Sequence, residues 1–393
     1  MTAHHPQTRA VHPPVISPSG SRPLGQPIYQ GHLFAFDGAD DLAASFGGPD
    51  EAFMYARMSN PTVRSLERAV TEMEGGAGAL ATASGMGAIN AVLTGLLRSG
   101  DHVIAQSALY GGTYALLQDL AERWGVEVTY VPGDDPAEVR DALRPATRVL
   151  YLETVANPTT HVTDIPAFTA AVRGTGVRTV VDNTFAPLLF APLGHGADVV
   201  VHSATKYIGG HGDVIGGVAV FADADVRRRV WEHAVELGAT VDAFTAWLAL
   251  RGIATLPMRI ARQSATALDL ARRLGAHPSV ARVHYPGLTE HPQHDTARRL
   301  LPDGAGGVLA FEATGGRDAG RVFTEALRLV TLGPSLGAVQ TLAMHPASTS
   351  HRQMDAASLA AAGIGEATVR LAIGLEHPDD LWADLEQALA KTR

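Results

Sequence analysis

The 393-residue chain contains no cysteine. This absence excludes disulfide bonds, thiolate metal sites and a cysteine nucleophile, and it fits a reducing compartment. No segment holds 18 uninterrupted apolar residues, and the first 23 residues carry prolines and polar side chains where a signal peptide needs an apolar core. We therefore expect a cytoplasmic protein that does not interact with a membrane.

Positive charge is also scarce. The chain has 31 Lys and Arg residues against 40 Asp and Glu residues, and its formal net charge is -9. Binding to a phosphate backbone needs a basic surface, so nucleic acid is not an expected partner. Hydrophobic residues make up 46% of the chain and charged residues 18%, as in packed globular proteins. This length and composition suit an enzyme that acts on a small molecule.

Short apolar runs rich in Val and Ala alternate with longer amphipathic stretches. The runs cover residues 79–83, 102–105, 126–131, 147–153, 177–182, 198–203 and 216–222. Continuous apolar strands that alternate with helices are typical of a mainly parallel sheet covered on both faces. The sequence predicts an α/β fold with three parts: an N-terminal arm over residues 1–60, an α/β domain over 61–255 and a smaller C-terminal α+β domain over 256–393. The first 30 or so residues, rich in Pro, His, Ser and Gly, predict an extended segment that is ordered only by packing.

Lys206 follows one of these apolar runs, in "VHSATKYIGG". A nucleotide-binding P-loop places its glycines before the lysine, whereas here they follow it, so that role is excluded. A surface charge and a pair with Asp213 are alternatives. A lysine fixed at a strand end, with surroundings that lower its pKa, is also suited to form a Schiff base. We interpret Lys206 as a Schiff-base amine.

Asp182 ends the very apolar run "VVD". A buried carboxylate is costly unless a cation pairs with it, and a protonated pyridine nitrogen would serve. A helix N-cap is an equally acceptable interpretation of Asp182 taken alone.

Other polar groups could surround the same ligand. Residues 84–88, "SGMGA", open a predicted helix whose backbone N–H groups can face an anion, and the hydroxyls of Ser203 and Thr205 could donate to it as well. Tyr110 could stack on a cofactor ring or lie in the core. No histidine or carboxylate cluster has metal-ligand spacing, so no metal is expected.

The order of several motifs resembles that of the Cys/Met-metabolism family of pyridoxal-phosphate enzymes. The motifs are "YARMSNPT", "ASGMGA", "LYGGT", "ETVANP", "VVDNTF", "HGADVVVHSATKYIGGHGD", "HYPGL", "HPAST" and "VRLAIGLE". The resemblance runs from about Thr8 to about Ala388. It implies pyridoxal 5'-phosphate as the cofactor and the type I PLP-dependent transferase fold, with a mainly parallel seven-stranded sheet.

The resemblance also implies roles for individual residues. Lys206 matches the lysine that binds the cofactor covalently and moves protons, Asp182 the partner of the ring nitrogen, and Tyr110 the stacking and catalytic tyrosine. The residues that match the phosphate site are Gly85, Met86, Ser203 and Thr205, with Tyr55 and Arg57 reaching the phosphate of a neighbouring subunit. The residues that match the clamp for the substrate carboxylate are Arg370, Ser335 and Asn157.

The implied activity is a γ-lyase that eliminates a thiol from a sulfur amino acid of the methionine or homocysteine type, in a homotetramer built from two dimers that share active sites. The alternatives are γ-replacement, as in O-acetylhomoserine sulfhydrylase or cystathionine γ-synthase, cystathionine γ-lyase, and a non-catalytic cofactor-binding scaffold. Gly112 stands where methionine γ-lyases often have cysteine, and Gln340 where enzymes that act on cystathionine often have glutamate. The motif "TLAMHPAST" nevertheless resembles the methionine γ-lyase branch.

Overall fold

The computed structural model describes residues 4–12, 23–349 and 364–392. Its centre is a seven-stranded sheet with the order β1-β7-β6-β5-β4-β2-β3. The strands are β1 (Gly78–Thr82), β2 (His102–Gln106), β3 (Glu127–Val131), β4 (Thr147–Glu153), β5 (Arg178–Asp182), β6 (Val199–Ser203) and β7 (Gly217–Phe221). Strand β7 runs antiparallel to β1 and β6, and the other pairs are parallel. The predicted mainly parallel sheet is therefore confirmed.

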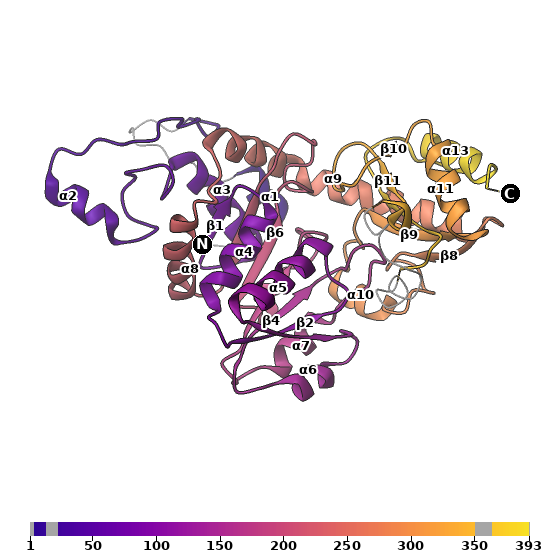
Figure 1. Cartoon of the computed structure of the whole chain (residues 1–393). Coiled ribbons are helices and arrows are strands. Elements are labelled where there is room, and N and C mark those ends of the chain that lie inside the picture. The colour runs from indigo at the N-terminus through magenta and orange to yellow at the C-terminus, as the bar shows by residue number, and fades with distance from the viewer. Residues whose placement is uncertain (1–3, 13–22, 350–363, 393) are drawn as a thin grey trace.

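Helices cover both faces of this sheet (Figure 1). Because side chains alternate along a strand, Val199 and Val201 of β6 enter one core while Val200 enters the other. The core with Val199 is closed by α4 (Gly85–Leu96), α5 (Gly111–Trp124) and α8 (Ala224–Leu237). The core with Val200 is closed by α3 (Pro61–Glu74), α6 (Pro136–Ala142), α7 (Ile165–Ala171) and α9 (Ala243–Gly275).

A second, five-stranded sheet forms the smaller part of the fold, at the right of Figure 1. Its strands, in spatial order, are β10 (Thr331–Leu332), β11 (Leu342–Met344), β12 (Thr368–Ala372), β9 (Val308–Ala313) and β8 (Val280–His284). The helices of this part are α10 (His294–Leu300), α11 (Gly316–Ala326) and α13 (Pro378–Leu389). Helix α9 connects the two parts and is continuous through residues 255 and 256, where the sequence predicts a domain boundary. The domain limits themselves stay a prediction.

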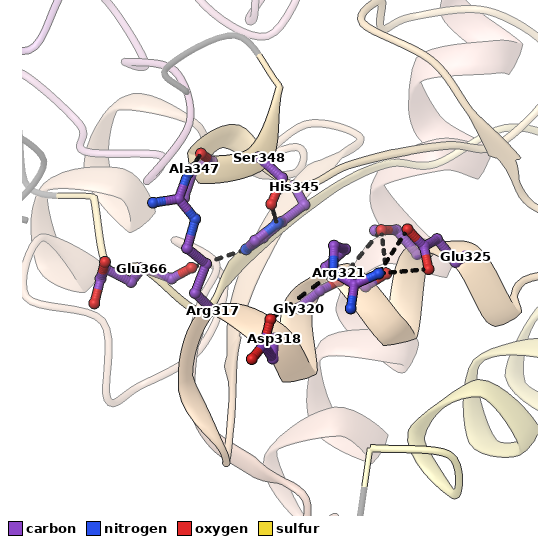
Figure 2. A network of polar contacts seen from close by, with 10 residues as sticks. Arg317, Asp318, Gly320, Arg321, Glu325, His345, Ala347, Ser348 and Glu366 are labelled. Carbon is purple, nitrogen blue, oxygen red and sulfur yellow. Dashed lines mark hydrogen bonds and ion pairs between the residues drawn. The ribbon is translucent and has the colours of Figure 1, made fainter. Parts of the chain in front are cut away.

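A buried histidine ties β11 to the chain that leads into β12. The His345 Nδ1 atom lies 2.8 Å from the Ser348 hydroxyl, and its Nε2 atom lies 2.8 Å from the Glu366 backbone carbonyl (Figure 2). Since a carbonyl only accepts, Nε2 carries the proton and Nδ1 accepts from Ser348. Gly320 of α11 leaves room for the ring, because a Cβ there would lie 2.5 Å from Nε2.

The N-terminal segment differs from the prediction of an extended arm. Residues 6–11 form the helix α1 (Pro6–Val11), which packs on α3 and α9 and buries Ala10. A proline at the first helical position and contact with two helices explain how such a polar segment becomes helical. Further along, α2 (Ala39–Ala44) and the 3-10 helix η1 (Ser45–Gly47) project from the body at the left of Figure 1. Within the described ranges, no helix is long and apolar enough to cross a membrane.

The turn that contains Lys206 is packed closely against other backbone segments at two glycines. The Gly210 N–H donates to the Lys206 carbonyl at 2.8 Å and closes the turn. On one side, a Cβ at Gly252 of α9 would lie 2.2 Å from the Ile208 carbonyl oxygen. On the other, a Cβ at Gly337 would lie 2.9 Å from the Lys206 carbonyl carbon. The lysine backbone is therefore fixed between α9 and the loop that precedes β11.

We predict that Gly252→Ala lowers the free energy of unfolding by about 1–2 kcal/mol. Alanine is favoured over glycine in a helix by about 1 kcal/mol, but overpacking costs about 1–3 kcal/mol, and a 2.2 Å approach to backbone oxygen belongs at the upper end. Urea unfolding measures the change. Gly194→Ala is the matched control, since a Cβ at Gly194 would have open space. Equal stability of the two variants would contradict the close packing of the Lys206 turn.

Candidate active site

A cavity of about 590 Å³ lies at the carboxyl ends of β4, β5 and β6. Ligands bind at this edge in open α/β sheets. The smaller part of the fold closes the cavity with Met344 of β11, Arg370 of β12, and Pro334 and Leu336 of the loop between β10 and β11. The site residues expected from the sequence that line it are Gly85, Met86, Tyr110, Asn157, Asp182, Ser203, Thr205, Lys206 and Arg370.

Lys206 is one of only two lysines in the chain, the other being Lys391. Its Nζ atom donates to the Ser335 hydroxyl at 3.0 Å. No carboxylate of the described residues forms an ion pair with it, so the predicted alternative of a pair with Asp213 is not observed. Burial lowers the pKa of Lys206, and the nearby charge of Arg370 lowers it further. Both effects favour the neutral, nucleophilic amine.

Asp182 faces the same cavity from the end of β5. Its Oδ1 atom accepts the Thr184 N–H at 2.9 Å. Burial raises the pKa of Asp182, whereas the hydrogen bonds from Thr184 and the proximity of His202 act in the opposite direction. No helix begins directly after Asp182, so the alternative of a helix N-cap is wrong. The carboxylate has room in the cavity for a cationic partner.

The start of α4 forms another wall of the cavity. Ser84 caps the helix by accepting the Gly87 N–H at 3.0 Å. A Cβ at Gly85 would lie 2.8 Å from the Ser203 Cβ, so only glycine lets the helix start approach β6 this closely. The Thr205 hydroxyl lies 3.1 Å from the Gly216 N–H and 3.3 Å from its carbonyl oxygen, and these contacts orient it. The first N–H groups of a helix lack intrahelical partners and favour an anion.

Arg370 projects from the centre of β12 and is only 3% exposed. Its guanidinium donates to Asn157 Oδ1 at 3.0 Å and to the Ser335 carbonyl at 2.7 Å. Its buried Nε atom has no partner among the described residues. Burial lowers the pKa of Arg370 to about 10. A buried guanidinium held by neutral acceptors is suited to bind a carboxylate.

Tyr110 lies at the start of α5 with its side chain half-exposed toward the cavity. A Cβ at Gly112 would lie 2.5 Å from the Tyr110 ring and 3.0 Å from the Met86 sulfur. A cysteine at position 112 would therefore have to displace this ring. Because Gly112 has no side chain, the Tyr110 ring can lie against the first turn of α5.

Four residues expected in or near the site do not line this cavity, and one of them, Ser335, nevertheless accepts a hydrogen bond from the Lys206 amine. Tyr55 and Arg57 line a separate hollow beside α2, and Arg57 donates to the Val235 carbonyl of α8. Gln340 is exposed and lies outside the cavity wall. The cavity of one chain is thus assembled without them.

Glu153, at the end of β4, also lines the cavity. Like Asp182, it is an acidic residue after an apolar run, "VLYL", so the sequence places it at a strand end but assigns it no role. The sequence offered no comparable pattern for the apolar side chains that the smaller part of the fold contributes to the cavity. Across the described ranges, no group of three or more His, Cys, Asp or Glu side chains could hold a metal ion.

Named relatives match nearly the whole chain. L-methionine gamma-lyase of Pseudomonas putida is 43% identical over 384 residues, which cover 97% of this chain and 96% of that protein. O-succinylhomoserine sulfhydrylase of Pseudomonas aeruginosa is 41% identical over 367 residues, which cover 93% and 91% of the two chains.

A solved structure from Campylobacter jejuni, named as an O-acetylhomoserine (thiol)-lyase, has a TM-score of 0.93 and 32% identity to this chain. The match covers 98% of this chain and 100% of the other, which contains an N'-pyridoxyl-lysine-5'-monophosphate. The family described as Cys/Met metabolism PLP-dependent enzyme matches residues 7–390. The protein therefore belongs to this family of PLP-dependent enzymes, and pyridoxal phosphate is its cofactor.

Proposed function

We propose that the protein is a γ-lyase that eliminates a thiol from a sulfur amino acid of the methionine or homocysteine type, giving a 2-oxo acid, ammonia and the thiol. One observation supports an amino acid as the substrate. The Ser335 hydroxyl accepts a hydrogen bond from Lys206, and the Ser335 carbonyl accepts one from Arg370. A carboxylate on Arg370 would therefore place the adjacent α-carbon near the Lys206 amine. The similarity to L-methionine gamma-lyase supports the choice of substrate.

The cavity fits the cofactor. Asp182 offers a buried carboxylate that needs a cation, as the ring nitrogen would provide, and the close contact at Gly85 leaves backbone N–H groups near a phosphate site. The half-exposed Tyr110 lines the same cavity and is proposed to stack on the ring. When bound, pyridoxal phosphate supplies an electron sink for charge that develops at the substrate α-carbon. The residues proposed to hold it are Lys206, Asp182, Tyr110, Gly85, Met86, Ser203 and Thr205.

Four side chains are proposed to act on the substrate. Lys206, whose pKa is lowered by burial and by Arg370, removes the α proton and moves a β proton as a general base. Arg370, with Asn157 beside it, orients the carboxylate. Tyr110 assists departure of the γ substituent from the open side of the cavity.

γ-Replacement is the second candidate, in which sulfide or a thiol takes the place of the leaving group of an activated homoserine. The similarity to O-succinylhomoserine sulfhydrylase favours it, as does Gly112, where methionine γ-lyases often have cysteine. Elimination and replacement use the same residues in this cavity, so the products must distinguish them. Cystathionine γ-lyase stays a further alternative. Enzymes that act on cystathionine often have glutamate where this chain has Gln340, but Gln340 is exposed and lies outside the cavity wall, so it does not count against this substrate.

We also propose that Tyr55 and Arg57 contact the phosphate of a neighbouring subunit, in a homotetramer built from two active-site-sharing dimers. Their position outside the cavity of their own chain and the projection of α2 from the body support this arrangement (Figure 1). We propose the cytoplasm as the location, and the absence of cysteine fits a reducing compartment of this kind.

We predict that the purified protein releases 2-oxobutanoate from methionine more efficiently than it forms homocysteine from O-acetylhomoserine and sulfide. Both products are quantified by mass spectrometry, and kcat/KM is compared for the two reactions. Lys206→Ala is the control, and loss of the base should reduce turnover by at least about 10²–10⁴-fold. A higher kcat/KM for homocysteine formation would replace the lyase proposal with γ-replacement.

We predict that two inactive variants restore activity when mixed. Arg57→Ala removes the residue given to the neighbouring site, and Lys206→Ala removes the lysine of its own site, so some hybrid sites receive both intact residues. Activity is measured after unfolding and refolding the mixture, with each variant treated alone as the control. If mass spectrometry shows hybrid oligomers but no activity returns, Arg57 does not act across subunits.

We predict that Arg370→Met raises the pKa of Lys206, because a repelling positive charge is removed. At pH 8, a smaller fraction of Lys206 would then be neutral, so an amine-directed reagent would label it severalfold more slowly in cofactor-free protein. Exposed Lys391, the only other lysine, is an internal reference in the same mass spectrum. An unchanged ratio of labelling rates would show that Arg370 does not affect the Lys206 amine.

A further inference from the structure

Glu153 is a buried carboxyl of the cavity that the proposed reaction does not use. It ends β4, is 3% exposed and lines the cavity. In the sheet register it lies directly opposite Asp182 of β5, so two carboxyls occupy the ends of adjacent strands. Because the two carboxyls are so close, they are expected to differ in charge and in role.

The hydrogen bonds of Glu153 connect two loops with different tasks. Its Oε1 atom accepts the Tyr110 N–H at 2.6 Å. Its carboxyl also faces the backbone N–H of Asn157, whose side-chain oxygen accepts from Arg370. One carboxyl thus links the loop of the cofactor-stacking tyrosine to the loop beside the substrate clamp.

Gln106, at the end of β2, supports this arrangement from the neighbouring strand. Its Oε1 atom accepts the Glu153 N–H at 2.9 Å, and its Nε2 atom donates to the Ala108 carbonyl at 2.7 Å. Gln106 is fully buried. Both the backbone of Glu153 and the segment that leads to Tyr110 are therefore fixed to the same side chain.

Charge separates the roles of the two acids. Burial raises the pKa of Glu153 well above its usual range, and the adjacent Asp182 raises it further. Asp182 is the better placed to ionise, since it accepts from Thr184 and lies near His202. Tyr151, whose pKa burial also raises, faces the pair as well, and Lys206, Tyr110 and His202 line the same cavity. Two adjacent buried carboxyls retain one proton between them because mutual repulsion disfavours double ionisation.

We propose that Glu153 is a positioning residue that holds Tyr110 and Asn157 as a neutral acid and leaves the negative charge of the pair to Asp182. The proposal rests on the roles proposed above for Asp182 and Tyr110. It predicts that an amide at position 153, which is neutral and keeps an acceptor oxygen, substitutes for the acid. An amide at position 182 removes the charge that the cofactor ring needs.

The test compares the binding of pyridoxal phosphate to four variants of the full chain. Glu153→Gln should leave the cofactor Kd within about threefold of the unsubstituted protein, whereas Glu153→Ala and Asp182→Asn should each raise it by about tenfold or more. Glu153→Ala should also weaken the visible circular dichroism of the bound cofactor, because Tyr110 loses its fixed position. Asp384→Asn is the matched control, since buried Asp384 accepts three backbone N–H groups within the smaller part of the fold.

Two outcomes would overturn the proposal. If Glu153→Gln weakens cofactor binding as much as Asp182→Asn does, Glu153 carries charge. If Glu153→Ala lowers only the melting temperature, as expected of Asp384→Asn, with unchanged Kd and circular dichroism, its role is purely structural. Should Glu153→Ala fail to fold, Glu153→Gln still decides between a charged and a neutral acid. These measurements need no turnover, so an inactive protein with methionine would refute the proposed reaction and leave this test intact.

Discussion

Buried charge without an ion-pair partner is the constraint on which this site depends. Within the described part of the chain, the amine of Lys206, the guanidinium of Arg370 and the carboxyl of Asp182 line one cavity, and none of them forms an ion pair. Isolated buried charges cost several kcal/mol each, so the folded protein gains when ligands neutralise them. A protonated ring nitrogen would neutralise the charge of Asp182, and a substrate carboxylate would neutralise the charge of Arg370. The same imbalance that binds ligands also keeps Lys206 reactive.

Such charges stay in place because the backbone around them is held from several directions. On the face of the sheet opposite Asp182, His202 Nε2 lies 2.7 Å from Glu74 Oε1, and the Asn183 amide donates to the same oxygen at 3.1 Å. This buried network ties the ends of β5 and β6 to α3. Hydrogen bonds beneath the strand ends thus limit movement of the groups above them.

The parts of this structure that depend on local sequence could be predicted. The seven apolar runs became strands, and Lys206 and Asp182 line the cavity because each follows such a run. Contacts between distant segments could not be predicted in the same way. The bridge from Lys206 through Ser335 to Arg370 joins residues far apart in the chain. The helix α1 likewise forms because it packs against α3 and α9, and its own polar sequence does not predict this packing.

Helix α9 links the two sheets as one continuous helix of 33 residues, and it contains one proline, Pro257. Because proline removes a backbone hydrogen bond, helices bend most easily at proline, and bending of α9 would be concentrated at Pro257. Gly252, which contacts the Lys206 turn, lies before Pro257 in the chain, and the second sheet with Arg370 follows it. Bending at Pro257 would therefore change the span between the carboxylate clamp and the lysine while the lysine stayed fixed to the large sheet.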